Sequence, residues 1–205
     1  PTTVLDIRWA SFDDYVRDLK AVHPATAKSI KREIKRARKS GLVLEKLADS
    51  RPLQEQLHGL LDVHYERLNH MPFPFAPSLV ATLQRNLGDK VVVYVASKDS
   101  ELLSVAIGVR AGDSLFLPVA GNSDRHRETY AYFNNLFYAP IADAIGSGIR
   151  RIYFGKLVYD LKTRRGCDIM ELSLYLRFDG RVNAAAHKAL LAGQPFTVRR
   201  AVTRG

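Results

Sequence analysis

The strongest constraint on the fold lies in the middle of the chain, where the hydrophobic pattern changes from helical to β. Three apolar or alternating runs follow one another at residues 90–97 (KVVVYVAS), 102–110 (LLSVAIGVR) and 114–120 (SLFLPVA). The connections between them have the length of hairpin loops. The sequence therefore predicts an antiparallel three-stranded meander. Pro118 has no N–H to give to a ladder, so we expect a break or an edge in the third strand.

Helical signals fill the chain before this meander. Ser11 followed by Asp14 marks a helix start, and apolar residues at helical spacing predict helices near 12–20, 24–40, 52–69 and 78–87, with a short strand at 42–47. The segment MPFPFAP at 71–77 is a loop because its prolines interrupt regular structure. Phe73 and Phe75 in this loop are candidates for the wall of a substrate cleft, or they seal the edge of the core.

After the meander, the pattern predicts a polar loop at 121–129, a long helix at 130–146, a strand at 151–154, a short basic helix at 159–165 and a strand at 169–178. A second short helix is expected at 183–192. The fold class is α+β, with a mixed and mainly antiparallel sheet flanked by helices. We expect one domain over 1–205, with a helical basic N-terminal segment (1–41), a sheet core (90–178) and a C-terminal helix with a basic tail (179–205).

Charge points to an anionic partner. The chain has 31 Lys and Arg against 21 Asp and Glu, a net charge of +10. Residues 24–39 hold seven of these basic residues and one acid, Glu33, so this helix carries a net +6. Its basic side is either a solvated face or a rim that attracts a phosphorylated substrate or an anionic membrane surface. The helix contains no aromatic residue, which disfavours base stacking on nucleic acid.

Several classes of protein are disfavoured. No apolar run reaches the length of a transmembrane helix, so stable membrane insertion is not expected, and PTTVLDIRW lacks the pattern of a signal peptide. Cys167 is the single cysteine and is expected to be buried and structural. His58, His64 and His70 lack matching carboxylates, so we expect no metal. These features favour a cytoplasmic protein, with peripheral contact at the inner membrane surface as a further expectation.

Three stretches occur together in the order of one family. They are Phe12–Tyr15 with residues 27–41, the meander with its long helix and Gly146-Ser-Gly148, and Gly155–Gly166. Over about residues 6–180 the chain resembles acyltransferases of the GNAT superfamily. It is most similar to the FemAB-like branch that includes cellulose- and peptidoglycan-biosynthesis-associated acetyltransferase domains. The resemblance implies N-acyl transfer, acetyl or aminoacyl, to an amine of a cell-envelope or polysaccharide-related substrate that is phosphorylated or linked to a lipid or nucleotide.

The resemblance also implies where substrates bind. The acyl donor would lie in a splay between the donor strand 114–120 and the strand that begins at Arg151. By the resemblance, Lys162 and Arg165 carry over as ligands for substrate phosphate, with Lys156 beside them. Lys162, Arg164 and Arg165 can project from one short basic helix, and both residue types suit phosphate. A backbone N–H near Val119 would donate to the oxyanion.

The donor itself is left open by the sequence. Acetyl-CoA or another acyl-CoA is expected for the superfamily, with Asn122, Arg125 and Arg127 in the loop after the donor strand as its ligands. This loop has one glycine, Gly121, where the superfamily's pyrophosphate loop has several. FemAB-like relatives use aminoacyl-tRNA as donor, which is the alternative.

The catalytic groups are candidates only. His126, Asp160 and Glu128 are possible general bases, and each could equally be a surface residue. Tyr159 could protonate a leaving group or simply pack.

Alternatives to an enzyme are an inactive scaffold with this fold and a basic nucleic-acid-binding module. FemAB-like proteins commonly carry two such domains, so we expect either a piece of a longer protein or a single domain that forms a homodimer.

Overall fold

A computed structural model describes residues 1–156 and 158–173. One compact unit spans Pro1–Glu171 and holds every element discussed below. The predicted helix at 183–192 and the second half of the predicted strand 169–178 lie outside the described residues. The extension of the domain to residue 205 stays a prediction. In the described part of the chain, no helix is long and apolar enough to cross a membrane.

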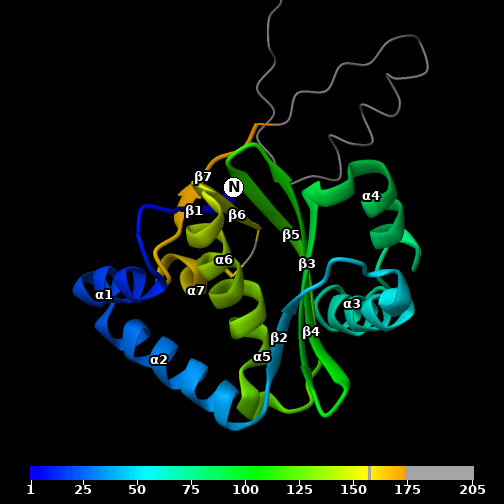
Figure 1. The fold of residues 1–205 in the computed structure, drawn as a ribbon, viewed down its shortest axis with the longest axis horizontal. Helices are drawn as coiled ribbons and strands as arrows, with labels where there is room; N and C mark the ends of the chain where they lie inside the picture. Colours follow the sequence, from blue (N-terminus) through cyan, green and yellow to red (C-terminus); the bar gives the residue numbers. More distant parts are fainter. Residues whose placement is uncertain (157, 174–205) are drawn as a thin grey trace, which may run out of the picture. The chain divides into compact units, whose positions relative to one another are not determined.

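A seven-stranded sheet forms the centre of this unit (Figure 1), with strand order β2-β3-β4-β5-β6-β1-β7. β5 and β6 run parallel, and all other neighbours are antiparallel. The predicted mixed, mainly antiparallel α+β sheet is therefore confirmed. The strands are β1 Thr2–Asp6, β2 Val43–Lys46, β3 Val91–Lys98, β4 Glu101–Ala111, β5 Ser114–Asn122, β6 Arg151–Gly155 and β7 Asp168–Met170.

The predicted meander corresponds to β3, β4 and β5. Pro118 does not end β5, because the register between β4 and β5 shifts there. Ile107 pairs with Val119 and Val109 pairs with Phe116, so two residues of β5 lie opposite Gly108. This bulge places Pro118 where no ladder hydrogen bond is needed. A Cβ at Gly108 would lie 2.3 Å from the Phe116 carbonyl oxygen, so the bulge requires glycine here.

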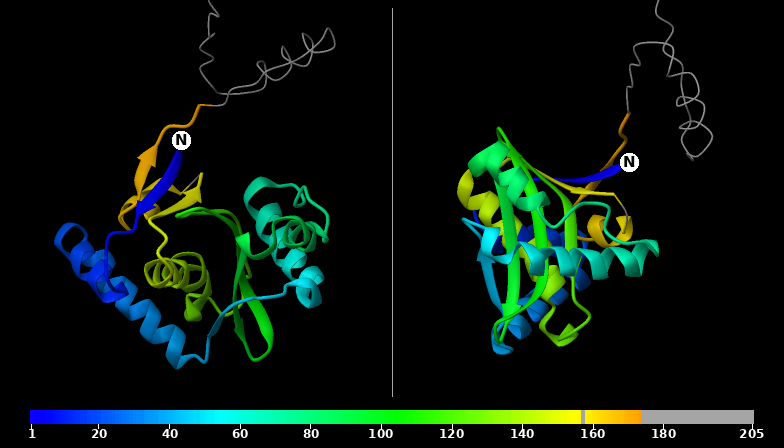
Figure 2. Two further views of the ribbon diagram at one scale, coloured as in Figure 1. Left: turned by 45° about the horizontal axis from the view of Figure 1, so that its top comes forward. Right: turned by 90° about the vertical axis from the view of Figure 1, so that its right-hand side faces the viewer.

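The prediction of an entirely helical N-terminal segment is wrong at its start. Thr2–Asp6 forms β1, which lies between β6 and β7 in the sheet. In Figure 2 the dark blue strand runs beside the orange one. The partners of β1 lie about 150 residues away in the chain, so no local hairpin signal could reveal this strand. The predicted sheet core of 90–178 is consequently too narrow, since β1 and β2 belong to the sheet.

Helices cover both faces of the sheet (Figure 1). Leu57, Leu61 and Val80 of α3 and α4 pack on one face against alternate residues of β3 and β4. The other face is covered by α1, α2 and α6, around a core that includes Tyr15, Ile30 and Phe137. The helices are α1 Phe12–Val22, α2 Pro24–Lys39, α3 Gln54–Asn69, α4 Leu79–Leu87, α5 Ala131–Phe133, α6 Ala139–Ser147 and α7 Tyr159–Thr163.

The long helix predicted for 130–146 contains an irregular turn. Asn134–Tyr138 is π-helical and joins α5 to α6. Pro140 at the start of α6 has no N–H for the carbonyl four residues earlier, which favours a wider turn at this point. Such π segments are frequent at functional sites. Here the wide turn presents Tyr138 to a buried ion pair described below.

Candidate active site

The sheet opens between β5 and β6. The two strands pair over three residues, from Ser114 opposite Arg151 to Phe116 opposite Tyr153. A Cβ at Gly155 would still lie 3.7 Å from Pro118 Cα, so the strands remain close at that point. β6 then ends at Gly155, while β5 continues to Asn122. Among the described residues, no strand pairs with the edge of β5 from Val119 onward on this side. This is the splay that the family resemblance implies.

Lys162 holds the end of β6 at this splay. Its Nζ donates to the carbonyl oxygens of Phe154, Gly155 and Lys156 at 2.8, 3.2 and 2.9 Å. These carbonyls lie where the ladder with β5 has stopped, so the ammonium supplies the hydrogen bonds that a neighbouring strand would otherwise give. Thr3 Oγ1 adds a second donor to the Gly155 carbonyl at 3.0 Å.

The expectation that Lys162 and Arg165 project from the short basic helix toward a substrate phosphate is wrong, because both side chains are buried. Lys162 is 4% exposed and Arg165 is 6% exposed, whereas Arg164 between them in the same turn is exposed. Burial lowers the pKa of Lys162 to about 8. With its three donors used by backbone carbonyls, Lys162 is a positioning residue for β6 and α7.

Arg165 joins three elements in the core. Its Nη2 lies 3.6 Å from Oε2 of Glu33 on α2 and donates to the Tyr138 hydroxyl at 3.2 Å. The Tyr138 hydroxyl in turn donates to Glu33. Arg165 Nη1 donates to the Leu161 carbonyl at 3.2 Å. Both charged side chains are 7% exposed, so the pair is shielded from solvent.

Aromatic rings surround this guanidinium. The Arg165 Cζ atom lies 4.4 Å from the centre of the Phe133 ring and 5.4 Å from that of Phe137. A buried cation is stabilised by such ring faces. Burial raises the pKa of the Tyr138 hydroxyl, which keeps it protonated as a donor. Burial also raises the pKa of the Cys167 thiol to about 12, in agreement with the prediction that Cys167 is structural.

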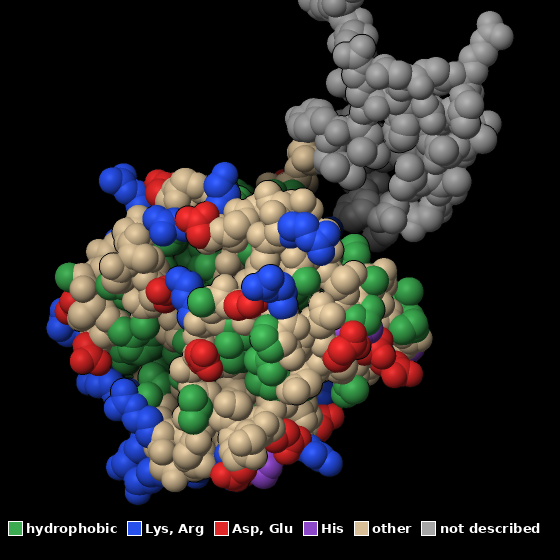
Figure 3. Space-filling view, turned by 45° about the vertical axis from the view of Figure 1, so that its right-hand side comes forward, with side chains coloured by type: hydrophobic (Ala, Val, Ile, Leu, Met, Phe, Trp, Pro, Cys, Tyr) green, Lys and Arg blue, Asp and Glu red, His purple; other side chains and the backbone are tan. Residues whose placement is uncertain are grey.

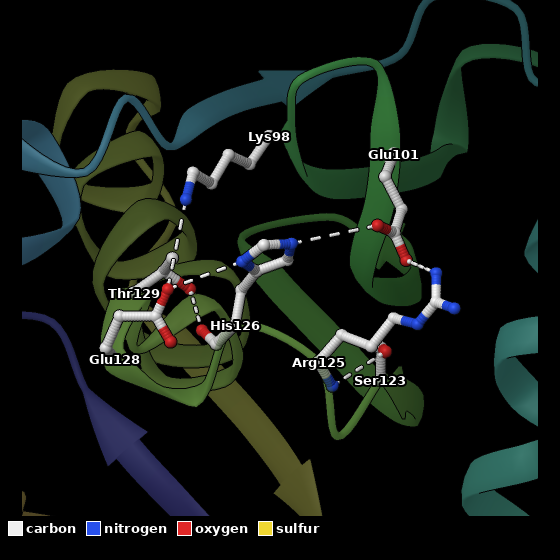
Figure 4. A network of polar contacts seen from close by, with 7 residues as sticks. All are labelled: Lys98, Glu101, Ser123, Arg125, His126, Glu128 and Thr129. Atoms are coloured by element: carbon white, nitrogen blue, oxygen red, sulfur yellow. Dashed lines mark hydrogen bonds and ion pairs between the residues drawn. The ribbon is translucent and has the colours of Figure 1, made fainter.

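The turn after β5 is a balanced network of charges (Figure 4). Arg125 Nη1 pairs with Glu101 at 2.9 Å, and Arg127 Nη2 pairs with Asp124 at 2.9 Å. The ring of His126 lies between Glu101 and Glu128, at 3.8 and 3.4 Å. Arg125 and Arg127, which were predicted to bind the cofactor, therefore lie together with His126, the predicted base. Each of the three has a carboxylate partner.

The end of this turn offers few free amides to the pyrophosphate of an acyl-CoA. The amides of Thr129 and Tyr130 donate to carbonyls within the turn, and the Ala131 amide donates to Thr129 Oγ1 at 3.2 Å. They are consequently not free to cradle a phosphate. The hydrogen bond from Arg67 holds the pKa of Asp124 below its ordinary value, so a negative charge stands at the turn. Gly121 is used elsewhere, because a Cβ there would lie 3.0 Å from the backbone of α3.

A groove of about 690 Å³ lies between α2 and α7. It collects Tyr159, Asp160 and Arg165, which were candidate site residues, but Lys162 does not line it. Asp160 and Arg164 are exposed, and Tyr159 donates to the Pro1 carbonyl at 3.1 Å. The groove thus offers a ligand one acidic side chain, Asp160, and one basic side chain, Arg164. Its lining is Ala25, Thr26, Ser29 and Glu33 on α2, with Val158, Tyr159, Asp160, Leu161, Arg164 and Arg165.

The remaining candidates lie apart from the groove. Phe73 is buried against Tyr65 and Val80 in the core beside α3, and Phe75 is half exposed with its carbonyl 2.8 Å from His58 Nε2. Asn122 donates to the Ser123 carbonyl at 2.6 Å. The backbone of Val119 lies on the open edge of β5, and Lys156 is exposed at the end of β6.

Sequence reasoning missed Glu33 and Tyr138 as partners of Arg165. A signal for Glu33 was present, since it is the one acid among seven basic residues of α2 and it falls on the apolar side of that helix. Periodicity alone places it beside Ile30 and Ala37, where an acid requires a buried cation. Arg164 was noted only as one of three basic residues, and it is the exposed one of the two arginines that line the groove.

The sequence profile described as the acetyltransferase (GNAT) domain matches residues 24–163. The chain therefore belongs to the GNAT acetyltransferase family. Acyl-CoA is the donor that GNAT acetyltransferases use in general. A comparison with curated protein sequences finds no match.

Solved structures of similar fold come from larger proteins. FemX superposes with a TM-score of 0.65 at 10% identity, over 82% of this chain and 58% of that chain. The C-terminal domain of a protein described as a lysylphosphatidylglycerol synthetase, from Agrobacterium fabrum, gives a TM-score of 0.50 at 12% identity, over 75% and 45%. This chain thus spans about half the length of the structures it matches. At these sequence identities, the structural similarity supports the fold alone.

Proposed function

We propose that this chain transfers an aminoacyl group from aminoacyl-tRNA to an amine of a phosphorylated or nucleotide-linked precursor of the cell envelope or of a polysaccharide. The observation that carries the proposal is the turn after β5. The amides of Ser123, Arg125, Thr129, Tyr130 and Ala131 make hydrogen bonds within the protein, and Arg125 and Arg127 are paired with carboxylates. A donor that depends on a pyrophosphate cradle is disfavoured there, whereas the FemAB-like resemblance implies a donor whose acyl group sits on a tRNA.

The acyl group would enter the splay between β5 and β6. In this position the open edge of β5 offers backbone groups to the ester carbonyl, with the Val119 N–H as our candidate for the oxyanion donor. Lys162 contributes by fixing the end of β6, where the pairing with β5 has stopped. The enzyme then acts chiefly by orienting the two substrates.

The acceptor would lie in the groove between α2 and α7. Arg164 is exposed there and suits a phosphate oxygen. The acceptor nitrogen forms a bond to the ester carbonyl carbon, and the bond from that carbon to the ribose oxygen of the tRNA breaks. Before this bond forms, Asp160, our candidate base, takes one proton from the acceptor ammonium. The second proton that the nitrogen loses passes to the departing ribose oxygen through Tyr159 or water.

The donor is tested by direct comparison. Purified protein is incubated with a nucleotide-linked amino-sugar or peptide acceptor, and with either tRNA charged with radiolabelled amino acids or radiolabelled acetyl-CoA. We expect label to reach the acceptor from charged tRNA only. Saturable transfer from acetyl-CoA without transfer from tRNA would overturn the proposed donor, and the chain would then act as an acetyltransferase like other members of its family. An absence of transfer from either donor would overturn the proposal.

Replacing Arg164 with Ala tests the groove as the acceptor site. Loss of one charge-assisted contact to phosphate costs about 1.5–3 kcal/mol, so we expect KM for the acceptor to rise by about 10- to 100-fold. Arg164→Lys should recover part of this, since it keeps the charge. Arg85→Ala on α4 removes an exposed arginine far from the groove lining and should leave KM unchanged. An unchanged KM in Arg164→Ala would place the acceptor elsewhere.

A further inference from the structure

In the described part of the chain, the densest run of basic residues lies on the outer side of α2. We define the basic face of α2 as the exposed residues Lys28, Lys31, Arg32, Lys35, Arg36, Arg38 and Lys39. In Figure 1, α2 runs along the lower left edge of the molecule, and Figure 3 shows Lys and Arg side chains gathered along the lower left rim.

The charge of this face is not neutralised locally. The one acid of α2, Glu33, is 5% exposed and is turned inward to Arg165. Among the residues that the structure describes, the seven basic side chains of the face make no ion pair. Two have polar contacts with neutral groups, since Arg36 donates to the Tyr130 hydroxyl and Arg32 donates to Ser29 Oγ, both at 3.2 Å. The face therefore projects an uncompensated positive potential.

The arrangement of these charges is linear. Lys28, Lys31, Lys35 and Lys39 recur at intervals of three or four residues, so they lie along one side of the helix. At 1.5 Å per residue the row is about 16 Å long. A row of this length can face several successive phosphates of one nucleic-acid strand.

The buried side of α2 indicates whether the partner of the basic face is an RNA or a membrane. A helix that binds in a lipid interface inserts an exposed apolar side between the headgroups. The apolar residues of α2, chiefly Ala27, Ile30 and Ala37, are instead buried in the core. The basic face itself has no apolar or aromatic residue, so it can bind charge but can neither insert into lipid nor stack on bases.

We infer that the basic face of α2 is a docking surface for the phosphate backbone of RNA, which binds by charge and without reading the bases. The choice of RNA among linear polyanions rests on the proposed function, in which the donor is a tRNA. The surface lies on the same helix whose first turns line the groove, with Thr26 and Ser29 in the lining. A tRNA held along α2 would therefore be anchored beside the proposed acceptor site.

The test measures binding of uncharged tRNA, which involves no acyl transfer. Fluorescence anisotropy is recorded from 50 to 300 mM salt for wild type and for the triple variant Lys28→Glu, Lys31→Glu, Lys35→Glu. Loss of about three phosphate contacts should reduce the slope of log K against log salt by about 2–3, and should weaken binding more than 10-fold at low salt. The control is Arg85→Glu, Lys90→Glu, Arg110→Glu, which makes the same change of net charge on exposed residues outside α2.

Each outcome decides a different point. If the α2 variant alone loses binding and keeps the wild-type circular dichroism and melting temperature, the docking surface is supported. Equal loss in both triple variants would show that net charge matters and would overturn the α2 surface. If wild type binds anionic lipid vesicles but no tRNA, the inference is wrong, while the transfer assay still decides the donor independently.

Discussion

Replacing Arg165 with Met is expected to lower the free energy of unfolding by about 3–5 kcal/mol. Removing one partner of a buried ion pair leaves the other charge without compensation in a medium that solvates it poorly. Here Glu33 would lose its cation, and the Tyr138 hydroxyl would lose one of its two hydrogen-bond partners. The measurement is urea denaturation followed by circular dichroism and by tyrosine and tryptophan fluorescence.

The neighbouring arginine gives a matched control. Arg164 has the same side chain in the same turn but is exposed, so Arg164→Met should change the free energy of unfolding by less than about 0.5 kcal/mol. A double-mutant cycle completes the test. Arg165→Met combined with Glu33→Leu removes both charges, and we expect it to be less destabilised than Arg165→Met alone. A loss below about 1 kcal/mol for Arg165→Met would contradict the structural role of this pair.

The buried pair also joins the two walls of the groove. α2 contributes Glu33, the π-helical turn contributes Tyr138, and the segment after α7 contributes Arg165. The two walls of the groove, α2 and α7, are thus joined through the core and not through their exposed side chains. This arrangement leaves the polar groups at the surface of the groove available for a ligand, while its shape depends on buried contacts.

Much of the fold could be predicted because its signals are local. The alternation that marks β3, β4 and β5 and the caps that bound α1 and α2 each lie within a few residues of one another. Ser11, for example, accepts from the Asp14 amide as its position predicted. β1 could not be predicted in this way, since five residues without a hairpin partner become a strand only when β6 and β7 offer their edges.

The site was harder to predict because burial depends on distant residues. A row of basic residues at 162, 164 and 165 has the same local pattern whether it is solvated or buried. Lys162 is buried because β6 ends with three carbonyls that need donors, and Arg165 is buried because Glu33 lies 132 positions earlier in the chain on the facing helix. Neither circumstance is visible in the short helix itself.

Replacing Lys162 with Met is expected to cost about 2 kcal/mol of stability at pH 7, since it leaves the carbonyls of Phe154 and Lys156 without their donor. The difference from wild type should then grow with pH. Burial lowers the pKa of Lys162 to about 8 from an ordinary 10.5, so between these values the unfolded chain binds more protons than the native one. Wild-type stability consequently rises through this window relative to the variant.

The full shift corresponds to at most about 3 kcal/mol. The measurement is the difference in unfolding free energy between wild type and Lys162→Met, by urea denaturation at pH 7, 8.5 and 10. A difference that stays flat, or that shrinks as the pH rises, would mean that the three carbonyls hold the ammonium charged despite its burial. Lys162 would then clamp the splay as a permanent cation at every pH where the protein folds.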